Sequence, residues 1–416
     1  MLGTVIVGAS QAGVQLAVSL REGGDTAPIV LVGEERHAPY QRPPLSKEFL
    51  AGTGPRAALD FRTPDFYVGH DIDLLCGDQV TGLALSDRAG GGTARTASGR
   101  DLPFSRLALT VGAAPRRLSV PGADLAGICY LRDVDDADGL RAALTAASAV
   151  VVVGGGFIGL EAAAAARTQG KTVTVVEMAE RLVPRAVAPL VSEFLRQAHE
   201  RRGTRVLLST GVVALEGEGG RVRGVVLHDG SVLPADLVVV GVGVVPRTEL
   251  AEQLGLECAG GIVVDAHART SAPSVVAAGD CTVQPHPLTG VGRVRLESVQ
   301  NAVSQATIAA RALLGDLTPA PAVPWFWSFQ GDLKLQIAGL ATGYDRHVLR
   351  GDPDSERFSV LYYRGDELLA LDAVNSPVDY MVVRKALGTG ATVPADRAGD
   401  TTASLKSLLV PVAAGV

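Results

Sequence analysis

The chain has 416 residues, of which 47% are hydrophobic and 20% are charged, and its formal net charge is −6. That length exceeds what one hydrophobic core usually supports, so two or three domains are expected, and the composition excludes a disordered or fibrous protein. The negative charge argues against general nucleic-acid binding, and no apolar run reaches the roughly 20 residues that a membrane-spanning helix needs.

The first predicted elements are a strand, a tight turn and a helix. The β-branched run Thr4–Val7 predicts the strand, and apolar residues at helical spacing over Val14–Leu20 predict the helix. Between them, Gly8, Ser10 and Gly13 occupy the three positions of the dinucleotide fingerprint, which serve the turn, the close approach of a pyrophosphate and helix packing. Serine replaces the second glycine, and it is small enough to let a phosphate approach. A nucleotide is therefore expected at this turn.

The next predicted strand ends in acidic residues. The apolar run Ile29–Val32 predicts a buried strand, and Glu34 follows at its end. A carboxylate at that position can accept hydrogen bonds from an adenosine ribose. Glu35 is the neighbouring alternative, and we expect it to be an exposed loop charge. Glu34 is therefore the predicted ribose ligand of the first site.

A second copy of this pattern is complete. Residues Ala149–Val153 predict a strand, Gly154, Gly156 and Gly159 fill all three fingerprint positions, and an Ala-rich helix is predicted over Leu160–Arg167. The alternative is a glycine-rich turn without a ligand, but strand, glycines and helix coincide here. The sequence therefore predicts a second dinucleotide site.

The strand after the second helix indicates which coenzyme binds. It is predicted over Val173–Val176 and is followed by Glu177, whose carboxylate would repel a 2′-phosphate and so favours NAD over NADP. Arg181 and Arg185 follow closely enough to weaken that preference. Two dinucleotide sites in one chain suggest one bound flavin and one transient nicotinamide.

Cysteine and histidine spacing restricts the other chemistry. Cys76, Cys129, Cys258 and Cys281 lie far apart and form no C-x-x-C pair, which disfavours a disulfide scaffold, a zinc site and a dithiol active site. The seven histidines show no metal-ligand spacing, so no metal is expected. Widely spaced cysteines fit a reducing compartment, and no signal peptide is recognised, so a cytoplasmic location is expected.

The last part of the chain predicts a small domain of its own. Alternating patterns over Phe358–Tyr363 and Leu368–Val374 predict two strands joined by a tight turn. Trp325 and Trp327 precede them and can either pack a core or edge a docking surface. The segment after Gly388 is expected to be less ordered.

These motifs resemble one family, the FAD-dependent ferredoxin reductases of oxygenase systems. Matching strings run nearly the whole length of the chain, and the Arg-Pro-Pro-Leu-Ser-Lys and Trp-Phe-Trp-Ser strings are specific to this group. The matching strings are Tyr40–Lys47 (YQRPPLSK), Tyr130–Arg132 (YLR), Gly154–Glu161 (GGGFIGLE), Ala278–Cys281 (AGDC), Arg295–Ala302 (RLESVQNA) and Pro324–Ser328 (PWFWS).

The resemblance implies an α/β fold with two Rossmann-like dinucleotide-binding domains, as in glutathione reductase, plus a C-terminal α+β domain. It implies FAD and NAD(H) as cofactors. The expected segments are an FAD-binding domain over 1–114 and 245–318, an NADH-binding domain over 115–244 and a domain capping the flavin over 319–416.

The resemblance also assigns individual residues to the cofactors. Asp280 would accept from a ribityl hydroxyl, although an ordinary helix-capping carboxylate is the alternative. Val80 and Val299 would line the flavin, although each could be a plain core residue. The full predicted set for FAD is Gly8, Ser10, Ala12, Gly13, Glu34, Lys47, Val80, Arg132, Asp280, Val299 and Trp327, and the set for NADH is Gly154, Gly156, Ile158, Gly159 and Glu177.

Lys47 and Glu161 are the catalytic pair that the resemblance implies. In the wider family a lysine beside the flavin pairs with a glutamate from the nicotinamide-domain helix. A cation at that place stabilises the negative charge of the reduced flavin, and the glutamate fixes its position. The alternatives are an exposed loop lysine and a helix-surface charge.

The expected reaction is hydride transfer from NADH to FAD, followed by single-electron transfer to a [2Fe–2S] ferredoxin that supplies a monooxygenase or dioxygenase. Because no dithiol is available, the electrons must leave from the flavin itself. Basic docking candidates are Arg293, Arg295, Arg311 and Arg346, each more easily explained as an ordinary solvated arginine. The alternatives are another acceptor on the same fold, such as rubredoxin or monodehydroascorbate, and an NADH-responsive flavin-bound interaction protein. Neither nucleic acid nor a membrane is an expected partner.

Overall fold

The computed structural model describes residues 2–86, 91–320 and 322–411. It divides the chain into two units. Unit 1 comprises Met1–Gln41, Ala57–Ala114 and Val245–Pro324, and unit 2 comprises Arg42–Arg56, Pro115–Val244 and Trp325–Val416. The predicted four segments stay a prediction, and residues 1, 87–90, 321 and 412–416 of those segments lie outside the described residues.

Unit 1 is built around a mixed sheet. Its strands are β1 (Gly3–Val7), β2 (Ile29–Gly33), β3 (Ile72–Cys76), β4 (Val80–Leu85), β5 (Gly92–Thr96), β6 (Asp101–Leu109) and β18 (Val275–Ala277). They lie in the order β3-β2-β1-β6-β5-β4, and β18 also pairs with β6. β1, β2, β3, β6 and β18 pair in parallel, whereas β4 and β5 join antiparallel. The carboxyl ends of β1 and β2 therefore share one edge, where ligands bind in open α/β sheets.

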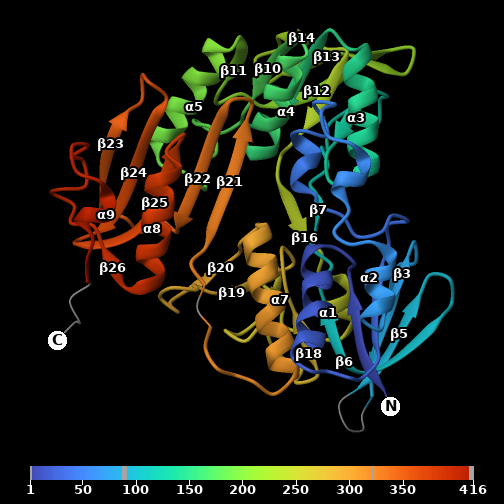
Figure 1. Ribbon diagram of the computed structural model, residues 1–416. Coiled ribbons are helices and arrows are strands. Elements are labelled where there is room, and N and C mark those ends of the chain that lie inside the picture. Colours follow the sequence, from blue (N-terminus) through green and yellow to red (C-terminus); the bar gives the residue numbers. More distant parts are fainter. Residues whose placement is uncertain (1, 87–90, 321, 412–416) are drawn as a thin grey trace. The chain divides into compact units, whose positions relative to one another are not determined.

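Helices cover this sheet and are held by buried apolar side chains. The shorter elements and helices of unit 1 are α1 (Gln11–Glu22), α2 (Pro64–Gly69), α6 (Glu249–Gln253), β17 (Ile262–Val263), β19 (Thr282–Pro285), β20 (Arg293–Val294) and α7 (Val299–Leu313). α1 and α7 lie side by side, as Figure 1 shows in blue and orange. Their apolar faces share one core cluster with β1 and β2, and a second cluster joins the same sheet to α6. Buried apolar contacts of β1 and α1 therefore hold the turn between these two elements in place.

Unit 2 contains a parallel sheet that resembles the parallel part of the sheet in unit 1. Its elements are η1 (Pro43–Ser46), β8 (Ile128–Tyr130), α3 (Val134–Ala146), β9 (Ala149–Val153), α4 (Phe157–Thr168), β10 (Thr172–Val176), α5 (Pro189–Arg201), β11 (Thr204–Leu207), β12 (Val212–Glu218), β13 (Arg221–Leu227), β14 (Val232–Pro234) and β15 (Leu237–Val240). The parallel order is β11-β10-β9-β15-β8, and β12, β13 and β14 form a separate antiparallel sheet. The valine-rich β15 is buried throughout and β9 is buried except at its first residue, Ala149, as expected for central parallel strands.

The C-terminal part of unit 2 is an antiparallel sheet with a helix against it. Its elements are β21 (Trp325–Gln330), β22 (Leu333–Gly339), β23 (Arg346–Asp352), β24 (Arg357–Arg364), β25 (Glu367–Val374), α8 (Pro377–Thr389), β26 (Ala391–Thr392), α9 (Leu405–Leu408) and β27 (Val410–Pro411). The strand order is β21-β22-β25-β24-β23, and α8 contacts β25 and β22. β21 is therefore an edge strand.

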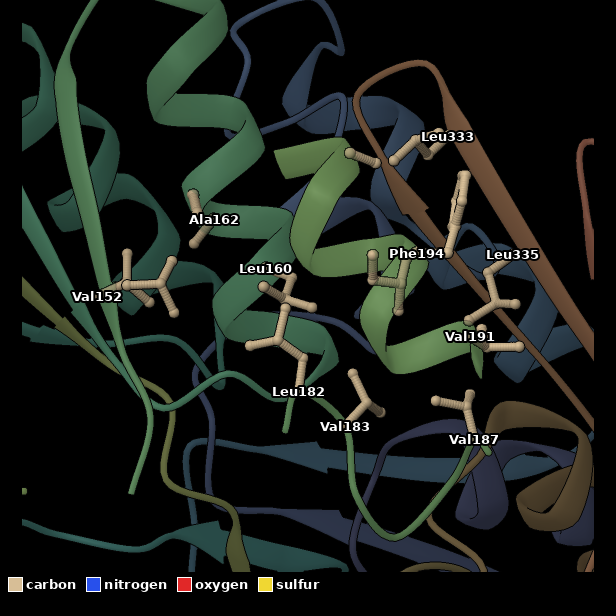
Figure 2. Packing of buried hydrophobic residues seen from close by; sticks show 14 of the residues in the cluster. Val152, Leu160, Ala162, Leu182, Val183, Val187, Val191, Phe194, Leu333 and Leu335 are labelled. Carbon is tan, nitrogen blue, oxygen red and sulfur yellow. The ribbon is translucent and has the colours of Figure 1, made fainter. Parts of the chain in front are cut away.

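One hydrophobic cluster ties this C-terminal sheet to the second nucleotide-binding half. Figure 2 shows Leu160 of α4 and Phe194 of α5 in the same cluster as Leu333 and Leu335 of β22. Phe194 also meets Phe358 of β24 edge-on, with 4.8 Å between ring centroids. Burying one such side chain contributes about 1.5–3 kcal/mol. The cluster therefore fixes β21 and β22 relative to α4 and α5.

The predicted strands and helices are present, with two differences. The helices α1 and α4 begin earlier than predicted, because Gly13 and Gly159 already lie in their first turns. The tail after Gly388 was expected to be less ordered, and this is wrong for its described residues. Arg350 donates to the carbonyls of Ala398 (3.3 Å), Asp400 (2.5 Å) and Ala403 (2.8 Å), which anchors the tail to β23.

Candidate active site

The first glycine turn leaves no room for larger residues at its two glycines. Gly8 has φ +112°, and a Cβ there would lie 2.3 Å from the carbonyl oxygen of Thr110. A Cβ on Gly13 would lie 2.0 Å from the carbonyl oxygen of Gly8. Ser10 occupies the N-cap position of α1, and Ala12 is buried in its first turn. Backbone N–H groups at a helix N-terminus are unsatisfied within the helix and favour an anion, so the turn fits a pyrophosphate.

Glu34 lies where the fingerprint places a ribose ligand, directly after β2. Its carboxylate pairs with the Arg247 guanidinium, and both side chains are more than one third exposed. Glu35 was expected to be an exposed loop charge, and this is wrong. Glu35 is half-buried and accepts a hydrogen bond from the Tyr40 hydroxyl, because the loop after β2 folds back over it. Glu34 remains the accessible carboxylate of this loop.

Asp280 follows Gly279, which has φ +90° and hydrogen-bonds to a cluster of polar side chains formed by Gln284, Asn301 and Gln305. The Gln305 amide oxygen accepts from the backbone N–H of Gly279 (2.8 Å) and from the Asn301 side chain (3.2 Å). The Gln305 amide group donates to Gln284 (2.8 Å). These buried amides fix the backbone before Asp280, and the sequence reasoning did not identify them.

The two valines assigned to the flavin lie at element starts. Val80 begins β4, pairs with Thr96 of β5 and is 6% exposed, so it also packs as a core residue. Val299 begins α7 and is half-buried, directly after the N-cap Ser298. Their contact with a flavin stays a prediction.

In the second glycine turn, two glycines are packed tightly against the protein backbone and one borders open space. A Cβ on Gly154 would lie 2.4 Å from the carbonyl oxygen of Gly241, and one on Gly159 would lie 2.1 Å from the carbonyl oxygen of Gly154. At Gly156 the nearest atom would be 3.8 Å away. The neighbouring Ile158 is 44% exposed. Gly154 and Gly159 are therefore required by the protein itself, whereas the space at Gly156 fits the approach of a coenzyme phosphate.

Glu177 closes this turn with its carboxylate. One oxygen accepts from the backbone N–H of Gly155 (2.6 Å) and the other from that of Ala179 (2.7 Å). Arg181 donates to Ser192 Oγ (2.8 Å) and to loop carbonyls, so it braces the loop after β10. Arg185 is exposed. Arg181 is therefore engaged elsewhere than at the Glu177 carboxylate, whose place at the ribose of NADH stays a prediction.

Lys47 and Glu161 form a buried ion pair in unit 2. Lys47 Nζ lies 2.7 Å from Glu161 Oε2, and the two side chains are 11% and 2% exposed. Lys47 also donates to the Pro43 carbonyl (3.1 Å). The second oxygen of Glu161 accepts from Ser328 Oγ (2.7 Å), and Oε2 also accepts from Ser46 Oγ (2.5 Å). Neither Lys47 nor Glu161 is the exposed surface charge that was the alternative.

Arg132 and Trp327 are held by other contacts of unit 2. The carbonyl of Arg132 accepts from Arg42 (2.6 Å), and its backbone N–H donates to Asp136 (2.9 Å). Trp327 stacks on Trp325 with 5.4 Å between ring centroids, and both rings are half-buried on the edge strand β21. Their roles toward a flavin stay predictions.

Three of the four arginines considered for docking are paired locally. Arg293 pairs with Glu257, Arg295 with Glu297 and Arg311 with Asp316. These exposed or half-buried pairs at the surface fit ordinary surface charges. Arg346 lies exposed at the start of the edge strand β23. The local pairs therefore explain Arg293, Arg295 and Arg311 without a docking role.

The cysteines offer no dithiol. All four are free, and burial raises the pKa of each thiol, to about 12 for the fully buried Cys281. A protonated thiol is a poor nucleophile. Within the described residues, no cluster of histidine, cysteine and acidic side chains could hold a metal ion, and no helix is long and apolar enough to cross a membrane.

Comparisons with known proteins match this geometry. The family model described as pyridine nucleotide-disulphide oxidoreductase matches residues 3–306, and one described as reductase C-terminal matches residues 325–409. The chain belongs to the pyridine nucleotide-disulphide oxidoreductase family. Rhodocoxin reductase of Rhodococcus erythropolis is 44% identical over 405 residues, which cover 97% of this chain and 94% of the relative.

Solved structures of this family superpose on nearly the whole chain. The ferredoxin reductase for the CYP199A2 system from Rhodopseudomonas palustris has a TM-score of 0.93 at 41% identity and covers 98% of this chain and 99% of its own. The covalent putidaredoxin reductase–putidaredoxin complex has a TM-score of 0.93 at 39% identity, with 98% of each chain covered. The predicted fold class is confirmed, and so are the predicted oxidoreductase activity and the cofactors FAD and NAD(H).

Proposed function

We propose that this oxidoreductase takes hydride from NADH and passes single electrons to a [2Fe–2S] ferredoxin that supplies an oxygenase. The observation that carries the proposal is the buried Lys47–Glu161 pair in a chain that has two dinucleotide turns and no dithiol. Without a dithiol, electrons have to leave from the flavin. The relatives named as reductases of rhodocoxin and putidaredoxin support a small iron–sulfur protein as the acceptor.

The chain's residues bind, orient and shield. Bound FAD supplies the chemistry of accepting two electrons and releasing them singly. The turn at Gly8–Gly13 and Asp280 would hold it, while the turn at Gly154–Gly159 and Glu177 would hold NADH. Each turn offers backbone N–H groups to a pyrophosphate.

Lys47 would act as a fixed positive charge. Its side chain is 11% exposed and its ammonium is held by Glu161, so it needs no rearrangement when negative charge develops beside it. Removing one preorganised hydrogen-bond donor from an oxyanion hole costs about 2.7–4 kcal/mol in a known enzyme, which sets the scale for such groups. This geometry supports the roles that the resemblance implies for Lys47 and Glu161.

An anaerobic titration tests the proposal. The purified protein is expected to show flavin absorption that bleaches with NADH and recovers when an oxidised [2Fe–2S] ferredoxin is added. Oxidised rubredoxin and monodehydroascorbate serve as comparison acceptors. Recovery with one of these alone would replace the ferredoxin proposal, and bleaching with no recovery but NADH-driven dimerisation would favour the flavin-bound interaction protein.

We also propose a cytoplasmic location. Four free cysteines that are protonated and well separated fit a reducing compartment. Cell fractionation followed by thiol labelling of the isolated protein checks this, since all four thiols should be found reduced.

A further inference from the structure

A line of buried polar side chains extends from Glu161 away from Lys47. Ser328 Oγ lies 2.7 Å from Glu161 Oε1, Gln330 Nε2 lies 3.2 Å from Ser328 Oγ, and His199 Nε2 lies 2.8 Å from Gln330 Oε1. Glu161, Ser328, Gln330 and His199 are all at most 3% exposed. Buried polar groups without a partner are costly, so each member depends on the next.

The charge of Glu161 sets the direction of every bond in this line. An ionised carboxylate only accepts, so the single proton of Ser328 must point to Glu161. Ser328 Oγ can then only accept from Gln330, which must present its amino group. The amide oxygen of Gln330 therefore faces His199, which must carry its proton on Nε2. The ion pair at Lys47 thus dictates the tautomer of a histidine three groups away.

Three separate elements supply the line. Glu161 lies on α4, Ser328 and Gln330 lie two residues apart on β21 and so share one face of the strand, and His199 lies on α5. Burial lowers the pKa of His199, with Gln330 opposing and the Arg202 charge adding to the shift, so the imidazole is neutral and has one N–H to place. Arg202 itself is held by Asp332, just after β21.

We infer that Ser328, Gln330 and His199 are positioning residues that hold Glu161, and through it the Lys47 ammonium, in the geometry needed for flavin reduction. The inference rests on the proposed role of Lys47. Glu161 Oε2 is shared by Lys47 and Ser46, so only Oε1 can be anchored from the far side. Releasing Oε1 would let the carboxylate rotate and carry Lys47 with it.

Stopped-flow reduction of the FAD-loaded enzyme by NADH tests the functional part. Ser328→Ala and Gln330→Met are expected to lower the limiting reduction rate about tenfold or more, since displacements near 1 Å have such effects. The Kd for NADH should stay within about twofold, because the nucleotide turn is untouched. Gln197→Met is the matched control, since Gln197 is exposed on the same helix as His199 and donates to Glu193 on the preceding turn.

A magnetic resonance measurement tests the line without any turnover. Long-range proton–nitrogen correlation on the ¹⁵N-histidine holoenzyme should show His199, assigned by its loss in His199→Asn, as the Nε2–H tautomer. In Gln330→Met the preference for that tautomer should disappear. A purely structural role for Gln330 would lower thermal stability without moving the reduction rate relative to NADH affinity.

Lys47→Met separates the two hypotheses. If Lys47→Met does not slow flavin reduction, the proposed role of Lys47 is wrong. If Lys47→Met slows it but Ser328→Ala and Gln330→Met match the Gln197→Met control, the role of Lys47 stands and the positioning inference is overturned. An Nδ1–H tautomer of His199 in the unmodified protein would also overturn it.

Discussion

Gly156→Ala should separate coenzyme binding from folding. Gly156 has φ −80°, which alanine adopts freely, and the nearest atom to the new methyl group would be 3.8 Å away. The folded chain therefore accepts the methyl group, and the gain of about 0.4–1 kcal/mol from the lower entropy of the unfolded chain is offset by the poorer capping of α4 by alanine at its N-cap, so stability should change little. The methyl group occupies the space that we assign to the coenzyme phosphate.

The expected loss of NADH affinity follows from overpacking. A methyl group forced into a close contact costs about 1–3 kcal/mol, which corresponds to about 5- to 150-fold in Kd. Isothermal titration with NAD⁺ gives the affinity, and thermal unfolding gives the stability. FAD content should not change.

Two matched variants make the outcome interpretable. Gly139→Ala adds the same methyl group on α3, where no atom lies within 4 Å, and should leave NAD⁺ affinity unchanged. Gly159→Ala places a Cβ 2.1 Å from the Gly154 carbonyl oxygen and should destabilise the fold. Unchanged NAD⁺ affinity in Gly156→Ala would refute the assignment of this turn to the coenzyme.

Three further predictions concern charge. Glu177→Ser should lower the ratio of kcat/KM for NADH to kcat/KM for NADPH by about 10- to 100-fold, since removing one charged hydrogen-bonding group changes binding by about 1.5–3 kcal/mol. An unchanged ratio would contradict the proposed contact of Glu177 with the ribose. Arg202, with a smaller contribution from Arg201, lowers the pKa of Glu356 to about 2, so the stabilisation is present above the ordinary value of 4.5 and is lost as pH falls toward 2. Arg202→Met should remove most of that pH dependence of chemical unfolding, about 1 kcal/mol for a partly exposed ion pair. Burial raises the pKa of Asp372 to about 7, although the hydrogen bond from the Tyr362 hydroxyl 2.5 Å away opposes this. The contribution of Asp372 to the free energy of unfolding is therefore greatest below pH 3.8 and falls as pH rises to 7. Asp372→Asn should stabilise the protein at pH 8 by up to about 4 kcal/mol and change little at pH 4, as measured by chemical unfolding.

Local patterns made the nucleotide turns predictable. At Gly13 and Gly159 the atoms that exclude a Cβ are the carbonyl oxygens of Gly8 and Gly154 in the same turn, so spacing along the chain carries the information. At Gly8 and Gly154 the excluding atoms belong to residues distant in sequence, Thr110 and Gly241, and only the motif pattern signalled the glycine. The function of the family was predictable because the motifs that resemble the family are runs of consecutive residues, which can be recognised without knowing the fold. Glu35 was mispredicted because its partner depends on how a loop folds back.

The surroundings of Glu161 could not be predicted from spacing. Ser46 and Ser328 lie 115 and 167 residues from it along the chain, and His199 lies 131 residues from Gln330. Serine, glutamine and histidine in strands and helices carry no periodic signal for such a contact. The resemblance paired Lys47 with Glu161, but only the fold brings the other members to the same carboxylate.

The Arg42–Arg56 segment explains why the most specific string of this chain is a proline-rich one. It lies between two pieces of unit 1 in sequence yet belongs to unit 2. Pro43 and Pro44 open the short helix η1, where a fixed φ and a missing N–H cost nothing. That turn presents two consecutive residues, Ser46 and Lys47, to one oxygen of Glu161. An extended strand would point consecutive side chains to opposite sides, so the prolines are what allow the pair to converge on one carboxylate.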